Sequence, residues 1–229
     1  DHRDLHKEYR RQRQMCIRDS ILSTVGIKVD REGAEDLYNK YIKEQLAVQS
    51  DGSTDNTVNV FRDVKLALEL KKSPEDQNFP LYVAEIEEDK FYIVPIRGNG
   101  LWNAIFGYIS IKEDLNTVKG VVFDHVGETA GLGAEITQDW FKERFVDEKL
   151  FDSDYNLMGI KVSKTNNDPS NLDKSDHEVD FISGATITCD GVTDMITERM
   201  NHYIPYFKSI KESETSLAFS MSNIDSNIN

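Results

Sequence analysis

Residues 81–123 read LYVAEIEEDKFYIVPIRGNGLWNAIFGYISIKEDLNTVKGVVF, and this stretch decides the fold. Apolar side chains alternate with others along four short runs, which are Leu81 to Glu87, Phe91 to Ile96, Ala104 to Ile111 and Thr117 to Phe123. A period of two residues is typical of β-strands, and short polar connections favour antiparallel neighbours. The centre of the chain therefore predicts a twisted antiparallel sheet.

Helical patterns flank this sheet on both sides. Apolar residues recur three or four apart over residues 33–48, which predicts an amphipathic helix, and a second apolar stripe follows Thr188. We expect Pro205 to end or kink this last helix. Residues 138–148 predict a short helix whose core-facing side chains are Trp140, Phe141 and Phe145. The predicted fold class is α+β, with a twisted antiparallel sheet flanked by helices.

Three further segments have weaker patterns. Residues 57–73 fit either a strand or a helix, so both remain open. Residues 157–162 predict another strand, and residues 164–178, rich in Asn, Asp, Ser and Pro, predict a loop.

The two ends of the chain differ from the region between them. Residues 1–20 are rich in charged side chains without an apolar period, so we predict a disordered or helical extension, or foreign sequence, outside the folded domain. Residues 21–211 form the expected domain. Residues 212–229 are rich in Ser and Asn and predict a disordered tail.

Composition excludes several classes of function. The chain has 41 acidic against 27 basic residues, a net charge of −14, whereas nucleic-acid binding usually needs a basic face. No stretch approaches the roughly 20 apolar residues that span a bilayer. Cys16 and Cys189 are too few for a disulfide scaffold and lack zinc-ligand spacing. We expect no metal site, and residues 176–178 (DHE) are predicted to be a solvated acidic loop.

The segment that carries chemistry is DFISGATIT, from Asp180 to Thr188. Gly184 permits a tight turn, and the following helix directs unpaired N–H groups and the positive end of its dipole towards this turn. Such a turn is suited to binding a phosphate. An ordinary helix cap by Thr186 or Thr188 fits the same residues.

The pattern Asp180-x-x-Ser183-Gly184-Ala185-Thr186 matches the flavinylation motif of the FMN-binding domain family, which this chain resembles. The resemblance implies that Thr186 carries FMN through a phosphoester bond, attached by a separate flavin transferase that uses FAD and magnesium. Thr186 is then the acceptor of a modification, because an unassisted threonine hydroxyl is a weak nucleophile. Asp180 would assist recognition by the transferase or orient the turn. Thr188 is included among the expected flavin-site residues.

A second segment, GETAGLGAE at residues 127–135, resembles the Glu-Thr-Pro-Gly-Leu-Gly stretch that lines the flavin in that family, with Ala130 in place of Pro. Thr129 would offer a hydroxyl to the ring, and Gly131 and Gly133 would leave room for it. A glycine-bearing turn between a strand and a helix is the alternative. The residues expected to line the flavin here are Glu128, Thr129, Gly131, Leu132 and Gly133.

A third segment, GLWNAIFGY at residues 100–108, resembles the C subunits of the sodium-translocating NADH:quinone reductases and adds Trp102 to the expected flavin site. A buried strand with one large aromatic is the alternative. The resemblance implies a flavoprotein that passes electrons through FMN in a sodium-pumping, ubiquinone-reducing respiratory complex, and that is not catalytic in isolation. Two alternatives stay open, which are the flavin-bearing G subunit of an Rnf-type electron-transport complex and a non-redox binding domain of the same fold.

The same resemblance implies partners and a location. The partners would be the other subunits of a membrane-bound complex and, during maturation, the flavin transferase. The domain would lie on the periplasmic side of a bacterial inner membrane, behind a single membrane anchor that this chain lacks. His125 could contact the flavin or serve structure, and Cys189 is expected to be a small buried residue.

Overall fold

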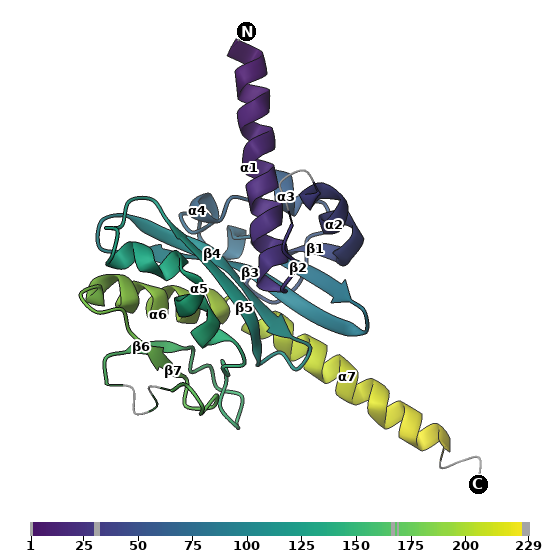
Figure 1. Ribbon diagram of the computed structural model, residues 1–229. Coiled ribbons are helices and arrows are strands. Elements are labelled where there is room, and N and C mark those ends of the chain that lie inside the picture. The colour runs from purple at the N-terminus through teal and green to yellow at the C-terminus, as the bar shows by residue number, and fades with distance from the viewer. Residues whose placement is uncertain (1, 30–32, 166–167, 169, 226–229) are drawn as a thin grey trace.

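A five-stranded antiparallel sheet forms the centre of the computed structural model, which describes residues 2–29, 33–165, 168 and 170–225 (Figure 1). The strands pair in chain order, and β2 to β5 follow one another through short connections, whereas residues 49–78 separate β1 from β2. The four predicted strands are confirmed as β2 to β5, and the predicted fold class is confirmed with them. The strands are β1 (Ile42–Val48), β2 (Phe79–Ile86), β3 (Asp89–Asn99), β4 (Ala104–Lys112) and β5 (Val118–His125).

Both faces of this sheet are covered by other elements (Figure 1). Successive side chains of a strand point to opposite faces, so Leu81 and Val83 belong to one apolar core while Tyr82 and Ala84 belong to the other. This double burial explains why β2 and β3 are apolar over long runs. One face packs on α6 (Thr186–Asn201), and α5 (Asp139–Lys142) and the 3-10 turn η3 (Glu143–Phe145) lie beside β5. The other face packs on three helices, α1 (His2–Thr24), α2 (Ala34–Tyr41) and α3 (Val60–Asp63).

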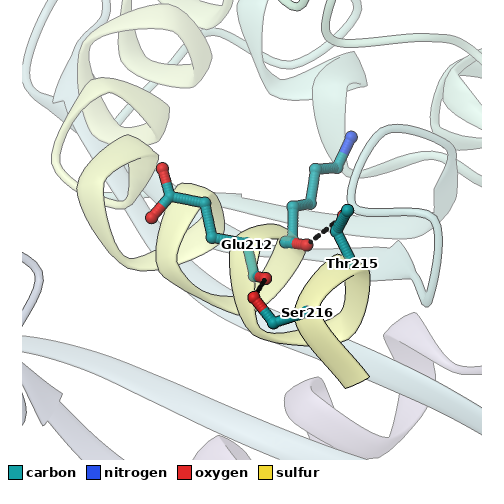
Figure 2. Close-up of a pocket in the computed structure, with 4 residues that line it drawn as sticks. Glu212, Thr215 and Ser216 are labelled. Carbon is teal, nitrogen blue, oxygen red and sulfur yellow. Dashed lines mark hydrogen bonds between the residues drawn. The ribbon is translucent and has the colours of Figure 1, made fainter. Parts of the chain in front are cut away.

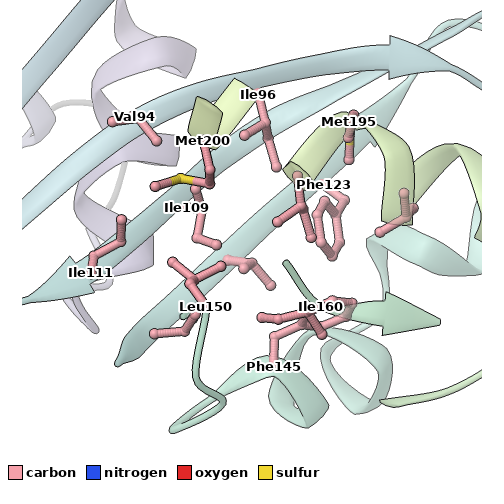
Figure 3. Close-up of a cluster of buried hydrophobic side chains, with 14 of the residues drawn as sticks. Val94, Ile96, Ile109, Ile111, Phe123, Phe145, Leu150, Ile160, Met195 and Met200 are labelled. Carbon is pink, nitrogen blue, oxygen red and sulfur yellow. The ribbon is translucent and has the colours of Figure 1, made fainter. Parts of the chain in front are cut away.

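The larger core lies between the sheet and α6 and fixes where α6 begins (Figure 3). Two glycines bring the helix close to β3. A Cβ on Gly98 would lie 2.6 Å from the Cβ of Met195, and one on Gly191 would collide with the carbonyl oxygen of Asn99. Figure 3 labels core side chains from the strands, the loops and α6: Val94, Ile96, Ile109, Ile111, Phe123, Phe145, Leu150, Ile160, Met195 and Met200.

Short elements complete the fold and lead into α6. Strands β6 (Lys161–Ser163) and β7 (Glu178–Asp180) form a small parallel pair, in which Ser163 lies opposite Asp180. Within the predicted loop 164–178, residues 166, 167 and 169 lie outside the described residues, and β7 begins at its last position. The remaining elements are α4 (Leu66–Glu69), η1 (Pro74–Asp76), η2 (Gly133–Thr137) and α7 (Ile204–Asp225).

Two predicted elements differ in the structure, and a third segment, left open by the sequence, is helical. The helix predicted over residues 33–48 is wrong in its second half, because the chain leaves α2 at Tyr41 and pairs with β2 as the edge strand β1. Residues 57–73, for which strand and helix remained open, form two single-turn helices, α3 and α4, so the helical alternative is the one observed. The strand predicted at residues 157–162 begins at Lys161, since Leu157 makes only an isolated bridge to Phe151.

Two predictions about single side chains also need correction. Phe141 and Phe145 are fully buried as predicted, but Trp140 is 44% exposed, so its predicted place in the core is wrong. The break in the last helix falls at His202 and Tyr203, before Pro205. Pro205 lies in the first turn of α7, where its missing N–H costs no helical hydrogen bond.

The chain ends are helical wherever the structure describes them. Helix α1 continues through the expected boundary between residues 20 and 21, and Arg18 Nη2 lies 3.0 Å from Glu35 Oε1 on the domain. The disordered tail predicted at residues 212–229 is instead helix as far as Asp225, because no Gly or Pro interrupts residues 206–225. Residue 1 and residues 226–229 lie outside the described residues. Across the described residues, no helix has both the length and the apolar character that crossing a bilayer requires.

One buried carboxylate, Glu148, makes the stability of this fold depend on pH. The residue follows η3 in the chain, and its side chain is fully buried. Its Oε1 lies 3.2 Å from Lys174 Nζ, whereas its Oε2 has no hydrogen-bond partner among the described residues. Burial, with a smaller effect of the nearby Asp176, raises the pKa of Glu148 to about 7 against the opposing effect of Lys174.

We expect Glu148→Gln to flatten the dependence of stability on pH. The pKa in the fold lies above the value of about 4.3 in an unfolded chain, so the protonated form stabilises the fold at low pH and this contribution is lost as pH rises through 7. Urea denaturation should show the stability of the variant, relative to wild type, rising by about 2 kcal/mol between pH 5 and pH 8.5. The exposed Glu143→Gln serves as control, and equal pH profiles for both variants would contradict the assignment.

Candidate functional site

The turn between β7 and α6 contains the hydroxyl-rich motif. Gly184 has φ +78°, a conformation that favours glycine, and a Cβ there would lie 2.8 Å from Leu132 Cδ2. The N–H of Ala185 donates to the carbonyl of Ile182 at 3.0 Å, which closes the turn. The helix then starts at Thr186, so the motif places this residue in the first helical turn.

The two threonines of the motif have different surroundings. The N-cap residue of α6 is Ala185, which makes no side-chain capping bond, so neither Thr186 nor Thr188 caps the helix. Thr188 is buried, and its Oγ1 donates to Glu128 Oε2 at 2.7 Å. Thr186 is only partly buried, and its hydroxyl has no hydrogen-bond partner within the described residues. It stands next to the first N–H groups of α6, which have no partner inside the helix.

Glu128 joins three segments that are far apart in the sequence. Its Oε1 accepts the backbone N–H of Trp102 at 3.0 Å in the loop between β3 and β4, while its Oε2 binds Thr188 on α6. The residue is only 8% exposed. Burial alone would raise the pKa of Glu128, but the hydrogen bonds from Thr188 and from backbone N–H groups of the β3–β4 loop together lower it, so the group is an anion at neutral pH.

Two glycines make room for this carboxylate. A Cβ on Gly100 would lie 2.5 Å from Glu128 Oε1, and one on Gly133 would lie 2.5 Å from Glu128 Oε2 and 2.6 Å from Thr188 Oγ1. Gly133 therefore accommodates Glu128 directly. Gly131 differs, since it has φ +75°, has open space around it, and donates its N–H to Glu135 Oε1 at 3.0 Å.

A cleft of about 180 Å³ opens beside these groups. Its mouth is apolar, with Leu101 47% and Ile187 55% exposed. Trp102 stands at the rim, where its indole N–H donates to Thr129 Oγ1 at 3.2 Å. The residues that line the cleft are Leu101, Glu128, Thr129, Leu132, Gly133, Gly184, Ala185, Thr186, Ile187 and Thr188.

Most of the predicted flavin residues thus come together, and four do not line the cleft. Asp180, Ser183 and Gly131 are not among the lining residues, and Trp102 reaches the site only through its hydrogen bond to Thr129. Leu101 and Ile187 line it but were not predicted. Both neighbour predicted residues in the sequence, yet only the fold reveals that these apolar side chains remain exposed at its mouth.

Asp180 has a partner that sequence reasoning missed. Arg144 Nη1 lies 3.0 Å from Asp180 Oδ2, and the guanidinium lies 5.2 Å from the centre of the Trp140 ring. The two residues of the ion pair are 36 positions apart in the sequence, and no local pattern links them. Asp180 is therefore held from outside the cleft.

Other candidate residues have structural contacts. His125 Nδ1 accepts the N–H of Glu128 at 3.0 Å. Cys189 is buried as predicted, and burial raises the pKa of its thiol. In the acidic loop, His177 Nδ1 meets the Lys149 carbonyl at 2.7 Å and Glu178 pairs with Lys161. Among the described residues, no three His, Cys, Asp or Glu side chains gather as they would around a metal ion.

A larger hollow of about 520 Å³ lies along α7, away from this motif (Figure 2). The hydroxyls of Thr215 and Ser216 donate to the carbonyls of Lys211 and Glu212 in their own helix, at 2.8 and 2.9 Å. The residues that line this hollow all belong to α7, and the hydroxyls among them are already hydrogen-bonded within that helix. The smaller cleft is therefore the candidate site.

Comparison with known proteins agrees with this choice. The family model of the FMN-binding domain matches residues 100–201, which include the whole cleft lining. The C subunit of the Na(+)-translocating NADH-quinone reductase of Vibrio anguillarum is 32% identical over 187 residues, which cover 75% of this chain and 71% of that protein. The same subunit of Haemophilus ducreyi is 28% identical over 218 residues, covering 86% and 82%.

A solved structure shows the same similarity to this C subunit. The crystal structure of the C subunit of this reductase from Parabacteroides distasonis has a TM-score of 0.79 and 31% identity, covering 88% of this chain and 96% of that one. Sequence and fold thus agree over most of the chain, and the motif turn and Glu128 lie inside the matched domain. The chain belongs to the family formed by the C subunits of the Na(+)-translocating NADH-quinone reductases.

Proposed function

We propose that this chain is a flavoprotein that holds FMN through a phosphoester bond on Thr186 and passes electrons as a subunit of a sodium-translocating NADH:quinone reductase. One observation carries the proposal. Thr186 presents a hydroxyl without a hydrogen-bond partner in the described residues, at the mouth of a cleft and at the start of α6. The similar hydroxyl two residues later is buried against Glu128.

The residues around the cleft suit the parts of FMN. The free N–H groups and the dipole at the start of α6 favour a phosphate next to Thr186. Exposed Leu101, Leu132 and Ile187 offer apolar contact to a flat ring. When bound, FMN supplies the electron-accepting and electron-donating chemistry, and the protein supplies binding, orientation and electrostatics.

Attachment needs a separate enzyme, because the two carboxylates that hold the turn in the described part of the chain are already engaged. Asp180 is paired with Arg144, and Glu128 is occupied by Thr188 and backbone N–H groups. A flavin transferase with FAD and magnesium would provide the activation. Thr186 Oγ forms a bond to the FMN-side phosphorus as the pyrophosphate P–O bond breaks. AMP leaves with the electron pair, and the hydroxyl proton passes to a base of the transferase.

The proposed setting is the periplasmic side of a bacterial inner membrane, with the other subunits of the complex as partners. The apolar rim supports a protein partner at the cleft, since Trp102 is 68%, Ile187 55% and Leu101 47% exposed. The relatives named above favour this complex over an Rnf-type complex or a non-redox domain. The chain would carry electrons without turning over a substrate by itself.

We expect Thr186→Ala to abolish covalent flavin, because it removes the accepting oxygen. The test is in-gel flavin fluorescence after denaturation, in cells that also express a flavin transferase. Thr188→Ala is the matched control and should stay fluorescent, while losing about 1–3 kcal/mol of stability through the orphaned Glu128 oxygen. A fluorescent Thr186→Ala band, or a dark wild type, would refute attachment at Thr186.

We expect Glu128→Ala to destabilise the apo-protein by about 2–3 kcal/mol, because it leaves buried backbone N–H groups and Thr188 unpaired. Glu128→Gln should retain most of the stability, since its amide can donate to Thr188 and its carbonyl can accept from Trp102. Urea denaturation measures both. Glu135→Ala removes a carboxylate from the adjacent turn η2, where its bond to the Gly131 N–H is exposed, and should cost about 0.5 kcal/mol or less. Equal losses for the two alanine variants would show that Glu128 does not hold the cleft together.

A further inference from the structure

We propose that Arg144 is the positioning residue of the flavin-attachment turn, and that it fixes Asp180 so that the turn presents Thr186 to the enzyme that loads it. The inference rests on the proposed attachment at Thr186. It assigns a role to a residue outside the motif, outside the cleft and 36 positions earlier in the sequence than Asp180.

The ion pair between Arg144 and Asp180 is partly shielded from water. The two side chains are 28% and 27% exposed, with 3.0 Å between Nη1 and Oδ2. Trp140 covers the guanidinium at 5.2 Å, which gives this half-exposed ring a function in place of its predicted core position. A shielded pair keeps its geometry better than a fully solvated one, which water and salt screen.

The backbone of Arg144 is itself firmly placed. The next residue, Phe145, is fully buried in the larger core. The Arg144 carbonyl accepts from Asn171 Nδ2 at 2.6 Å and from Lys174 Nζ at 3.2 Å. Arg144 therefore holds the segment before β7 through its main chain and the end of β7 through its side chain.

The contact at Asp180 is transmitted along a short path to Thr186. Asp180 is the last residue of β7, a strand of only three residues, and the N–H of Phe181 donates to the Ser163 carbonyl at 3.2 Å. Ile182 is buried, and its carbonyl closes the turn by accepting from Ala185. The turn is thus held before its start by Arg144 and after its end by Glu128, with the Thr186 hydroxyl between the two.

The protein contains a matched control pair on the same strand. Lys161 Nζ lies 3.1 Å from Glu178 Oε1, two residues before Asp180, and joins β6 to β7. This pair would stabilise β7 without touching the turn. If only the general stability of β7 matters, removing either cation should slow attachment equally.

The experiment measures flavin attachment to purified apo-protein by a flavin transferase with FAD and magnesium. We expect Arg144→Met to lower the rate at saturating apo-protein about tenfold with little change in KM, because positioning acts after binding. Lys161→Met should stay within twofold of wild type, and Arg144→Lys, which restores the charge, within about threefold. In-gel fluorescence gives rates, mass spectrometry of the Thr186 peptide gives occupancy, and circular dichroism verifies folding. If Arg144→Met does not fold, Arg144→Gln replaces it, with the same thresholds.

Two results would overturn the inference. One is a folded Arg144 variant that accepts flavin at the wild-type rate, and the other is an equal slowing by Lys161→Met. A wild type that accepts no flavin would instead refute the proposed function, so the two failures are distinguishable.

Discussion

The buried carboxylate of Glu128 is the interaction on which the candidate site depends. An ionised group this shielded is costly unless several donors surround it, and here the donors come from the β3–β4 loop and from α6. Those segments must therefore meet at one point, which is possible only because Gly100 and Gly133 lack side chains there. The cleft is the space left beside that meeting point, so its shape follows from satisfying one charge.

The contact between Glu128 and Thr188 also gives the two threonines of the motif different surroundings. Residues two apart on a helix are rotated by about 200° about its axis, so the side chains of Thr186 and Thr188 leave the helix in nearly opposite directions, although both residues contribute to the cleft lining. The core places α6 so that Thr188 points inward to Glu128, which leaves Thr186 at the mouth of the cleft. Which hydroxyl is available thus depends on helix rotation, which Met195 and Gly191 fix against β3.

The sequence predicted features that arise from local patterns and missed those that arise from tertiary contacts. Strands β2 to β5 follow from alternation, and most of the cleft lining follows from contiguous motifs. Strand β1 was missed because its residues also fit a helix, and only pairing with β2 selects the strand. Trp140 has the spacing of a core residue, but it covers Arg144, whose partner Asp180 is distant in sequence. The exposure of Leu101 and Ile187 likewise depends on the complete fold.

A modification site of the proposed kind has two opposing requirements. The acceptor must be accessible to a loading enzyme, yet a tethered redox group must stay at a fixed distance from its electron partners. A loop stabilised by its own contacts would meet the second requirement by burying the acceptor. Here the side-chain contacts that hold the turn lie beyond both its ends, at Arg144 and at Glu128, the turn's own closing bond is between main-chain atoms, and none of these contacts uses the Thr186 hydroxyl. The turn can therefore be rigid while its acceptor remains open, and this explains why the chain places charged groups in shielded positions on either side of a largely apolar mouth.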